Sequence, residues 1–122
     1  MNSQNIIIGF LNFRGQCSLT EARQKQAEDF LKHYNIDILH CQEIQVNDQT
    51  FSQCLYIQSN FNIITNNSLS TYGTASIVRN NFTINNVSRD NRGRVIIFDI
   101  NDTTYGNVYL PPGTDGVSRS ER

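Results

Sequence analysis

Apolar residues at the start of the sequence form first a continuous run and then a helical pattern. Residues 6–11, IIIGFL, are apolar and mostly β-branched, which predicts a strand covered on both faces. Ser18 stands three residues before Glu21, the spacing of a helix-capping box. Apolar positions recur at helical intervals beyond it, so the pattern predicts a helix over residues 19–34.

The helix is followed by a second strand pattern, and this order has a geometric consequence. Asn35 is a candidate left-handed helix cap, and residues 36–42 predict a strand. Two strands joined by a crossover helix are parallel, so their carboxyl ends emerge at one edge of the sheet, where open α/β sheets bind ligands. Asn12 and Glu43 stand at those two ends, and we expect them to lie close together.

The second half of the chain predicts an antiparallel meander. Turn clusters separate short β-rich runs, and residues 90–93 and 101–102 supply the Asn, Asp and Gly that tolerate turn angles. The predicted strands are residues 61–65, 74–79, 82–84, 95–100 and 104–109. The pattern as a whole therefore predicts an α/β fold with a β-α-β start followed by an antiparallel meander.

Length and composition narrow the class of protein. The chain has 122 residues, a net charge of -1 and 38% hydrophobic residues, which is typical of one small globular domain or a part of one. No apolar run is long enough for a membrane span, and residues 1–5 lack the basic start of a signal peptide, which favours a nuclear or cytoplasmic location. Near-neutral charge gives no overall attraction to nucleic acid, so such a partner needs local groups or a bound cation.

Cysteines and histidines are assigned to structure. Cys17, Cys41 and Cys54 match neither a paired disulfide framework nor a zinc pattern, so we expect reduced, mostly buried thiols. His33 falls on the polar side of the predicted helix, and His40 lies in a β-rich run. Neither histidine has the sequence context of a catalytic base or nucleophile.

Acidic residues are unevenly distributed, and this limits where a metal ion could bind. No Asp or Glu occurs at positions 52–88, and Glu43 at a strand end is the leading candidate ligand. Mg²⁺ takes oxygen ligands and usually only one or two carboxylates. Asn12 could hold a phosphate oxygen or orient a metal-bound water. The plain alternatives are a solvated carboxylate for Glu43 and a turn-forming role for Asn12.

Aromatic and basic residues near the C-terminal end are further candidates. Asn107 and Tyr109 share one face of a predicted strand, and the tyrosine hydroxyl could donate to a phosphate, although a half-exposed strand tyrosine is an alternative. Arg89, Arg92 and Arg94 cluster near a turn, where the simplest interpretation is a solvated hairpin with partial ion pairing. A phosphate contact by these arginines has no support from the sequence pattern.

Several motifs occur in the order and spacing of a known family. These are FLNFRG, an amphipathic helix, NIDILHCQE, YGTASIVRN, GRVIIFDI and GNVYLPPGT. Together they resemble the endonuclease/exonuclease/phosphatase family, and in particular the apurinic-endonuclease-like domain of non-LTR retrotransposon (reverse transcriptase) polyproteins. The resemblance covers essentially the whole chain, and LHCQE together with NVYLPPG is its most specific part.

The resemblance implies a two-sheet, DNase I-like α/β sandwich that hydrolyses phosphodiesters with Mg²⁺ or Mn²⁺ and acts on DNA. Asn12 matches the asparagine that orders the metal and catalytic groups, and Glu43 matches the carboxylate that binds the metal. Tyr109 matches the tyrosine that contacts the scissile phosphate. Tyr72 lies in a stretch similar to a loop that contacts nucleic acid. We expect Tyr72 and Asn107 to bind nucleic acid in this chain.

The sequence departs from the family pattern in two ways. Arg14 stands where the family often has Asp or Asn. The family's remaining site residues, an Asp and an Asn near the nucleophile and a further Asp and His, belong to a second half that these 122 residues do not match. We therefore expect residues 1–122 to be the N-terminal half of the domain, ending after the strand that closes at Tyr109, and to be inactive alone.

Two other functions remain open from the sequence. A member of the same family could act on a sugar phosphate, a phospholipid or an RNA tail instead of DNA. Alternatively, the chain could be a non-catalytic α/β interaction module that retains only the ancestry.

Overall fold

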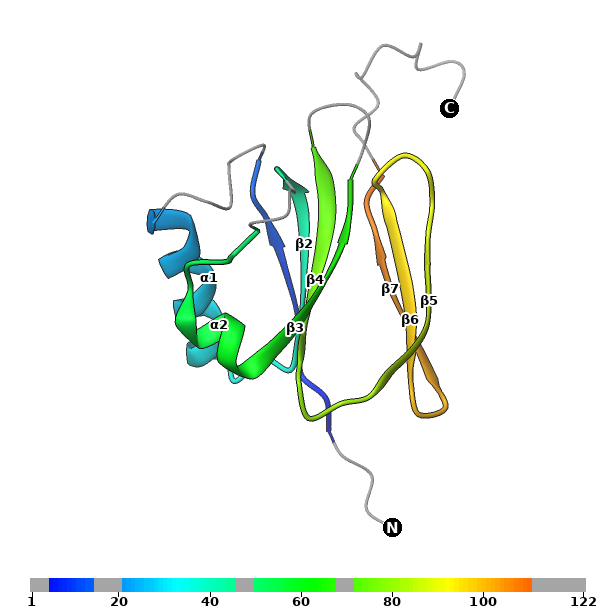
Figure 1. The fold of residues 1–122 in the computed structure, drawn as a ribbon, viewed down its shortest axis with the longest axis horizontal. Coiled ribbons are helices and arrows are strands. Elements are labelled where there is room, and N and C mark those ends of the chain that lie inside the picture. Colours follow the sequence, from blue (N-terminus) through cyan, green and yellow to red (C-terminus); the bar gives the residue numbers. More distant parts are fainter. Residues whose placement is uncertain (1–4, 15–20, 46–49, 68–71, 111–122) are drawn as a thin grey trace.

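The computed structural model describes residues 5–14, 21–45, 50–67 and 72–110. The chain forms three layers, with two helices on one face of a first sheet and a second sheet on its other face (Figure 1). The elements in chain order are β1 (Ile8–Asn12), α1 (Glu21–His33), β2 (Ile38–Ile44), α2 (Leu55–Asn60), β3 (Phe61–Asn66), β4 (Gly73–Arg79), β5 (Ile84–Arg89), β6 (Val95–Ile100) and β7 (Thr103–Val108).

The first sheet is mixed, with the strand order β1-β2-β4-β3. β1 and β2 are parallel and in register from Ile8 opposite Ile38 to Asn12 opposite Gln42, which confirms the predicted β-α-β start. β4 runs antiparallel to both β2 and β3. Because β1 and β2 are parallel, their carboxyl ends lie at the same edge, as the sequence predicts.

The helical layer covers the first sheet through an apolar core. Ala27 and Leu31 of α1 are fully buried and belong to a cluster that also holds residues of β2, β3, β4 and α2. Asn35 has φ 52°, which confirms the left-handed helix end. The predicted cap at Ser18 and the thiol of Cys17 lie outside the described residues.

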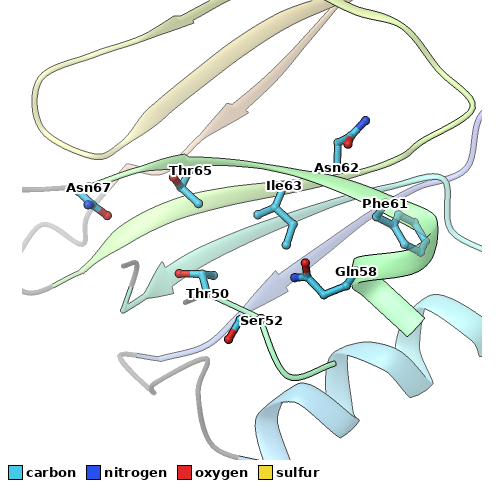
Figure 2. Close-up of a pocket in the computed structure, with 8 residues that line it drawn as sticks. All are labelled: Thr50, Ser52, Gln58, Phe61, Asn62, Ile63, Thr65 and Asn67. Carbon is cyan, nitrogen blue, oxygen red and sulfur yellow. The ribbon is translucent and has the colours of Figure 1, made fainter. Parts of the chain in front are cut away.

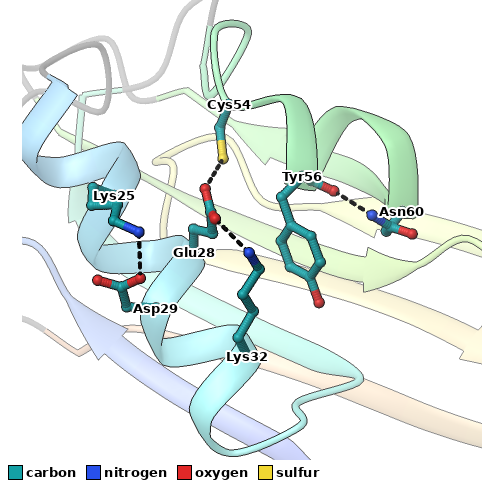
Figure 3. A network of polar contacts seen from close by, with 7 residues as sticks. All are labelled: Lys25, Glu28, Asp29, Lys32, Cys54, Tyr56 and Asn60. Atoms are coloured by element: carbon teal, nitrogen blue, oxygen red, sulfur yellow. Dashed lines mark hydrogen bonds and ion pairs between the residues drawn. The ribbon is translucent and has the colours of Figure 1, made fainter.

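A polar network joins α1 to the segment that starts α2, a helix that the sequence pattern did not predict (Figure 3). The Glu28 carboxylate accepts from Lys32 Nζ at 2.7 Å and from Cys54 Sγ at 3.6 Å. The Lys32 ammonium also lies 4.7 Å from the centre of the Tyr56 ring. Cys54 and Cys41 are both free and buried, which agrees with the expectation of reduced thiols.

The second sheet, with the order β5-β6-β7, packs on the opposite face of the first. Its buried residues Ile96, Phe98 and Ile100 alternate along β6 and form one cluster with Ile38 and Val78 of the first sheet. The predicted meander is therefore divided between the two sheets, since β3 and β4 belong to the first. The strand predicted at residues 82–84 is in fact β5, Ile84–Arg89, whose mostly polar residues hid it from the pattern.

The expectation that β1 is covered on both faces is wrong. Ile8 is 41% exposed and Phe10 is 59% exposed. β1 is one edge strand of the first sheet, and β6 and β7 of the second sheet pack against β4 and the opposite edge strand β3. The apolar inner face of β1 therefore extends past the second sheet. No helix in the described ranges is long and apolar enough to cross a membrane.

Candidate active site

Asn12 ends β1 in a turn that orients its side chain. Its Oδ1 accepts a hydrogen bond from the backbone N–H of Arg14 at 2.7 Å, and Arg14 has φ 53°. Phe13 between them is buried, and its backbone N–H donates to Gln42 O at 2.9 Å. With its oxygen held by the turn, the Asn12 amide nitrogen points toward the end of β2.

A β-bulge at the end of β2 directs Glu43. The register between β2 and β4 shifts between Gln42 and Ile44, and Glu43 has φ 52°. A non-glycine residue in this left-handed region carries a strain of about 1–2 kcal/mol. The bulge interrupts the alternation of side chains along the strand, so that Glu43 turns to the sheet edge instead of entering the core below the helices.

Asn12, Glu43 and Tyr109 converge although they are distant in sequence. Asn12 Nδ2 donates to Glu43 Oε2 at 3.1 Å, and the Tyr109 hydroxyl donates to the same oxygen at 2.7 Å. These two hydrogen bonds, the one from Tyr109 first, lower the pKa of the Glu43 carboxyl, and the nearby Arg14 charge acts in the same direction. Within the described residues no hydrogen bond reaches Oε1, so one carboxylate oxygen is open to a ligand.

A cavity of about 140 Å³ opens beside these groups. It is lined by Glu43, Tyr72, Gly73, Arg92, Gly93, Arg94 and Tyr109. Arg92 is exposed and Arg94 is half-buried, and neither guanidinium forms an ion pair with a described residue. Two unpaired positive charges next to a carboxylate and a tyrosine hydroxyl suit a phosphate group bridging a cation and the protein.

Buried polar side chains hold the turn between β5 and β6 at this position. Asn66 Nδ2 donates to Asp90 Oδ1 and to Val95 O, each at 2.8 Å, and Thr74 Oγ1 donates to Gly93 O at 3.1 Å. Asp90 also accepts from the backbone N–H of Arg94 at 3.0 Å. The turn is thus fixed to the first sheet.

The architecture can be compared with known structures. AP endonuclease from Archaeoglobus fulgidus matches with a TM-score of 0.66 and 20% identity, over 88% of this chain and 42% of that one. Truncated TDP2 from Caenorhabditis elegans matches with a TM-score of 0.57 and 22% identity, over 86% of this chain and 46% of that one. This chain has the DNase I-like fold. It is the fold of the endonuclease/exonuclease/phosphatase proteins, as the sequence motifs predicted.

The DNase I-like assignment rests on structure. TDP2 from D. rerio in complex with a single-strand DNA product also matches, with a TM-score of 0.54 and 10% identity, over 83% of this chain and 43% of that one. No family model matches the sequence, and no curated protein matches it either. The chain spans less than half the length of these DNase I-like structures.

The two residues predicted to bind nucleic acid, Tyr72 and Asn107, have different surroundings in this DNase I-like fold. Tyr72 lines the Glu43 cavity and is 43% exposed, so its predicted contact with nucleic acid stays a prediction with an accessible side chain. Asn107 is fully buried between the sheets, and its amide donates to Ala75 O at 3.1 Å. Its nucleic-acid contact also stays a prediction, and its position favours a role in holding the sheets together.

Two arginines of the β5–β6 turn, Arg92 and Arg94, line the cavity beside Glu43, a position that the sequence pattern did not indicate. The expected partial ion pairing of these arginines is not found within the described residues, where the nearby Asp90 carboxylate accepts from Asn66 and from backbone N–H groups. Arg89 Nε instead donates to Thr65 O at 2.6 Å. The only sequence signal for Arg92 and Arg94 was a glycine between them, and Gly93 has φ 74° in the structure.

The donor groups at the site fit a hard divalent cation. No cluster of three or more His, Cys, Asp or Glu side chains occurs in the part of the chain that the structure describes. Glu43 nevertheless offers one carboxylate oxygen to which no described residue is hydrogen-bonded, and Mg²⁺ is often held by one or two carboxylates with water and substrate phosphate completing its shell. Glu43 would hold the ion, with Asn12 orienting the carboxylate.

A larger cavity lies elsewhere and has different chemistry. It measures about 450 Å³ and lies beside the outer strand β3 (Figure 2). Its lining residues carry no charge: Thr50, Ser52, Gln58, Phe61, Asn62, Ile63, Thr65 and Asn67. We therefore place the candidate active site at Glu43 and not in the larger cavity.

Proposed function

We propose that this chain is part of a Mg²⁺- or Mn²⁺-dependent phosphodiesterase, a retrotransposon endonuclease that nicks DNA to supply a primer for reverse transcription. The observation that carries the proposal is the convergence of Asn12 and Tyr109 on one oxygen of Glu43, beside Arg92 and Arg94. Bound at Glu43, the cation would act as a Lewis acid on a phosphoryl oxygen. The DNase I-like fold and the family motifs support the substrate class.

Each residue then has a distinct task. Asn12 and the Tyr109 hydroxyl hold the Glu43 carboxylate in one orientation, which keeps Oε1 directed at the cation. The guanidinium groups of Arg92 and Arg94 bind phosphate oxygens and offset their negative charge. Tyr72 at the cavity rim contacts the nucleic acid beside the cleaved bond.

We propose that the 122 residues alone do not cleave DNA. Apart from Glu43, the cavity is lined by tyrosines, arginines and glycines, none of which is a general base at neutral pH. Activation of water would then depend on residues of a second half that follows in the complete protein. The less than half coverage of the matched structures supports this division.

Metal binding tests the role of Glu43 without requiring activity. Mn²⁺ added to the ¹⁵N-labelled chain should broaden the amide signals of Asn12, Glu43 and Tyr109 before those of the helices. Glu43→Gln should abolish this effect, because the neutral amide loses the charge that attracts the cation. Glu28→Gln, which removes a carboxylate on α1, is the matched control and should leave the broadening intact. Equal broadening in Glu43→Gln would contradict the metal site.

The source transcript tests the proposed second half, and a cleavage assay tests the proposed inactivity of the 122 residues. Sequencing beyond Arg122 should reveal an in-frame Asp-x-Asn, then an Asp-His pair, and then a polymerase domain. An in-frame continuation without these residues would argue for a non-catalytic module. Nicking of supercoiled plasmid by the 122-residue chain with Mg²⁺, abolished in Glu43→Gln, would contradict the proposed inactivity and confirm the metal chemistry.

A further inference from the structure

Asn107 is buried where an apolar residue would be expected. It lies on β7, the outer strand of the second sheet, and its side chain has no exposed surface. Its partner across the sheet is Ile96, which belongs to the apolar core between the two sheets. Burying an amide is costly unless its donors and acceptor are hydrogen-bonded. Packing alone therefore does not explain why an amide side chain is buried at this position.

The Asn107 side chain is hydrogen-bonded to both central strands of the first sheet. Its Nδ2 lies 3.1 Å from Ala75 O and 3.2 Å from Ser76 Oγ, both on β4, and 3.4 Å from Cys41 O on β2. Its Oδ1 accepts from Gln42 Nε2 on β2 at 3.3 Å. One side chain thus connects β7 to β2 and β4 through every polar atom that it has.

These hydrogen bonds lie next to the candidate active site along both segments. Gln42 directly precedes Glu43, and Asn107 stands two residues before Tyr109. Gln42 Nε2 also lies 3.5 Å from Val108 O, the residue between Asn107 and Tyr109. Any sliding of β7 over the first sheet would break these bonds and move the tyrosine hydroxyl away from the Glu43 carboxylate.

We propose that Asn107 is a positioning residue that sets the distance between Tyr109 and Glu43. The inference rests on the proposed function, because it concerns the geometry of that same site. Apolar contacts such as those of Ile96 and Phe98 hold the two sheets together but are not directional. The amide bonds have fixed directions and distances, so they define the register of β7 over β2. In this role Asn107, whose side chain is fully buried, acts on the site through Tyr109.

The hydroxyl proton of Tyr109 reports on this geometry without metal, substrate or turnover. In the unmodified chain, the hydrogen bond to Glu43 should slow exchange of this proton with water enough for an NMR signal from labelled tyrosine. In Asn107→Leu, which keeps the branched shape of the side chain but removes its hydrogen bonds, exchange should be about tenfold faster or the signal lost, as expected for losing a hydrogen bond to a charged group. Asn85→Leu, on exposed β5, is the matched control and should keep the signal.

Each outcome decides the inference. If Asn107→Leu is folded and keeps the slow hydroxyl exchange, Asn107 serves stability alone and the inference is wrong. If Asn107→Leu does not fold, Gln42→Met is decisive, because this half-buried residue bonds to the Asn107 oxygen. Faster exchange in Gln42→Met supports the inference, and unchanged exchange overturns it. Since no metal or DNA is present, failure here leaves the Mn²⁺ test of the proposed function unaffected.

Discussion

Acidification should destabilise the protein through His40, a residue outside the candidate active site. His40 is 1% exposed between the two sheets, and burial lowers its pKa from 6.5 to about 4. The unfolded chain binds a proton below about pH 6.5 while the folded chain stays neutral, so stability falls as the pH drops from about 6.5 toward 4. The lowered pKa corresponds to roughly 3 kcal/mol in the free energy of unfolding at neutral pH, and most of this contribution is lost by about pH 4.5.

No charged group among the described residues stabilises the protonated form of His40. Its Nδ1 lies 2.8 Å from Ser76 Oγ, and its ring packs against Phe10 and Phe98. The Ser76 oxygen also lies within hydrogen-bond distance of Asn107 Nδ2, which leaves its hydroxyl proton for the neutral imidazole. A protonated imidazole would instead donate at Nδ1 to the Ser76 oxygen, which would then accept from two N–H groups while its own proton lost the imidazole acceptor.

Urea unfolding at about pH 7.5 and pH 4.5 measures the effect. His40→Asn removes the ionisable ring but keeps an acceptor for Ser76. Between the two pH values, the free energy of unfolding of this variant should therefore fall by roughly 3 kcal/mol less than that of the unmodified chain. His33→Gln, at an exposed histidine, should retain the full pH dependence. Carboxylates are common to all three chains and cancel in the comparison. The same pH dependence in His40→Asn would refute the assignment to this residue.

Three further predictions concern the candidate site and its support. Tyr109→Phe removes the first cause of the lowered Glu43 pKa, so this pKa should rise toward its ordinary value in a ¹³C NMR titration; no rise would contradict the hydrogen bond. Gly73→Ala should lower the free energy of unfolding in urea by about 1–3 kcal/mol, because an added Cβ would clash with the backbone oxygen of Asn66. Gly106→Ala is the control, since its Cβ would lie 3.9 Å from the nearest atom, and it should be neutral or stabilising. Asn66→Leu should destabilise by about 1–3 kcal/mol, because the Asp90 carboxylate loses a buried donor; an unchanged unfolding midpoint would show that the turn is held otherwise.

The sequence could predict the β-α-β start because local signals agree there. The run before Asn12 and the cap at Asn35 fix the ends of the unit, and the parallel arrangement follows from the crossover helix. That geometry alone brought Asn12 to Glu43 without knowledge of any contact. The family motifs added Tyr109, which periodicity could only call a strand tyrosine.

The division into two sheets could not be predicted from local patterns. β5 consists mainly of exposed polar residues, so its strand character depends on pairing with β6. β4 separates β2 from β3 through contacts between distant residues, for which a single sequence contains no signal. The position of Arg92 and Arg94 beside Glu43 depends on that packing, so no local pattern could indicate a phosphate contact by these arginines.

Within the described residues two strands depart from regular pairing, β2 at Glu43 and β5 at Asn86. Glu43 occupies the left-handed region at a bulge, although β2 is otherwise a regular buried strand. Between the two sheets, Asn107, His40 and Ser76 are buried polar residues beside the apolar cluster of β6. Each feature lowers stability unless its partners are in place, and strain of this kind is typical of functional sites. A fold selected for stability alone would not need a strained carboxylate at the sheet edge, so the bulge at Glu43 supports the site independently of the motifs.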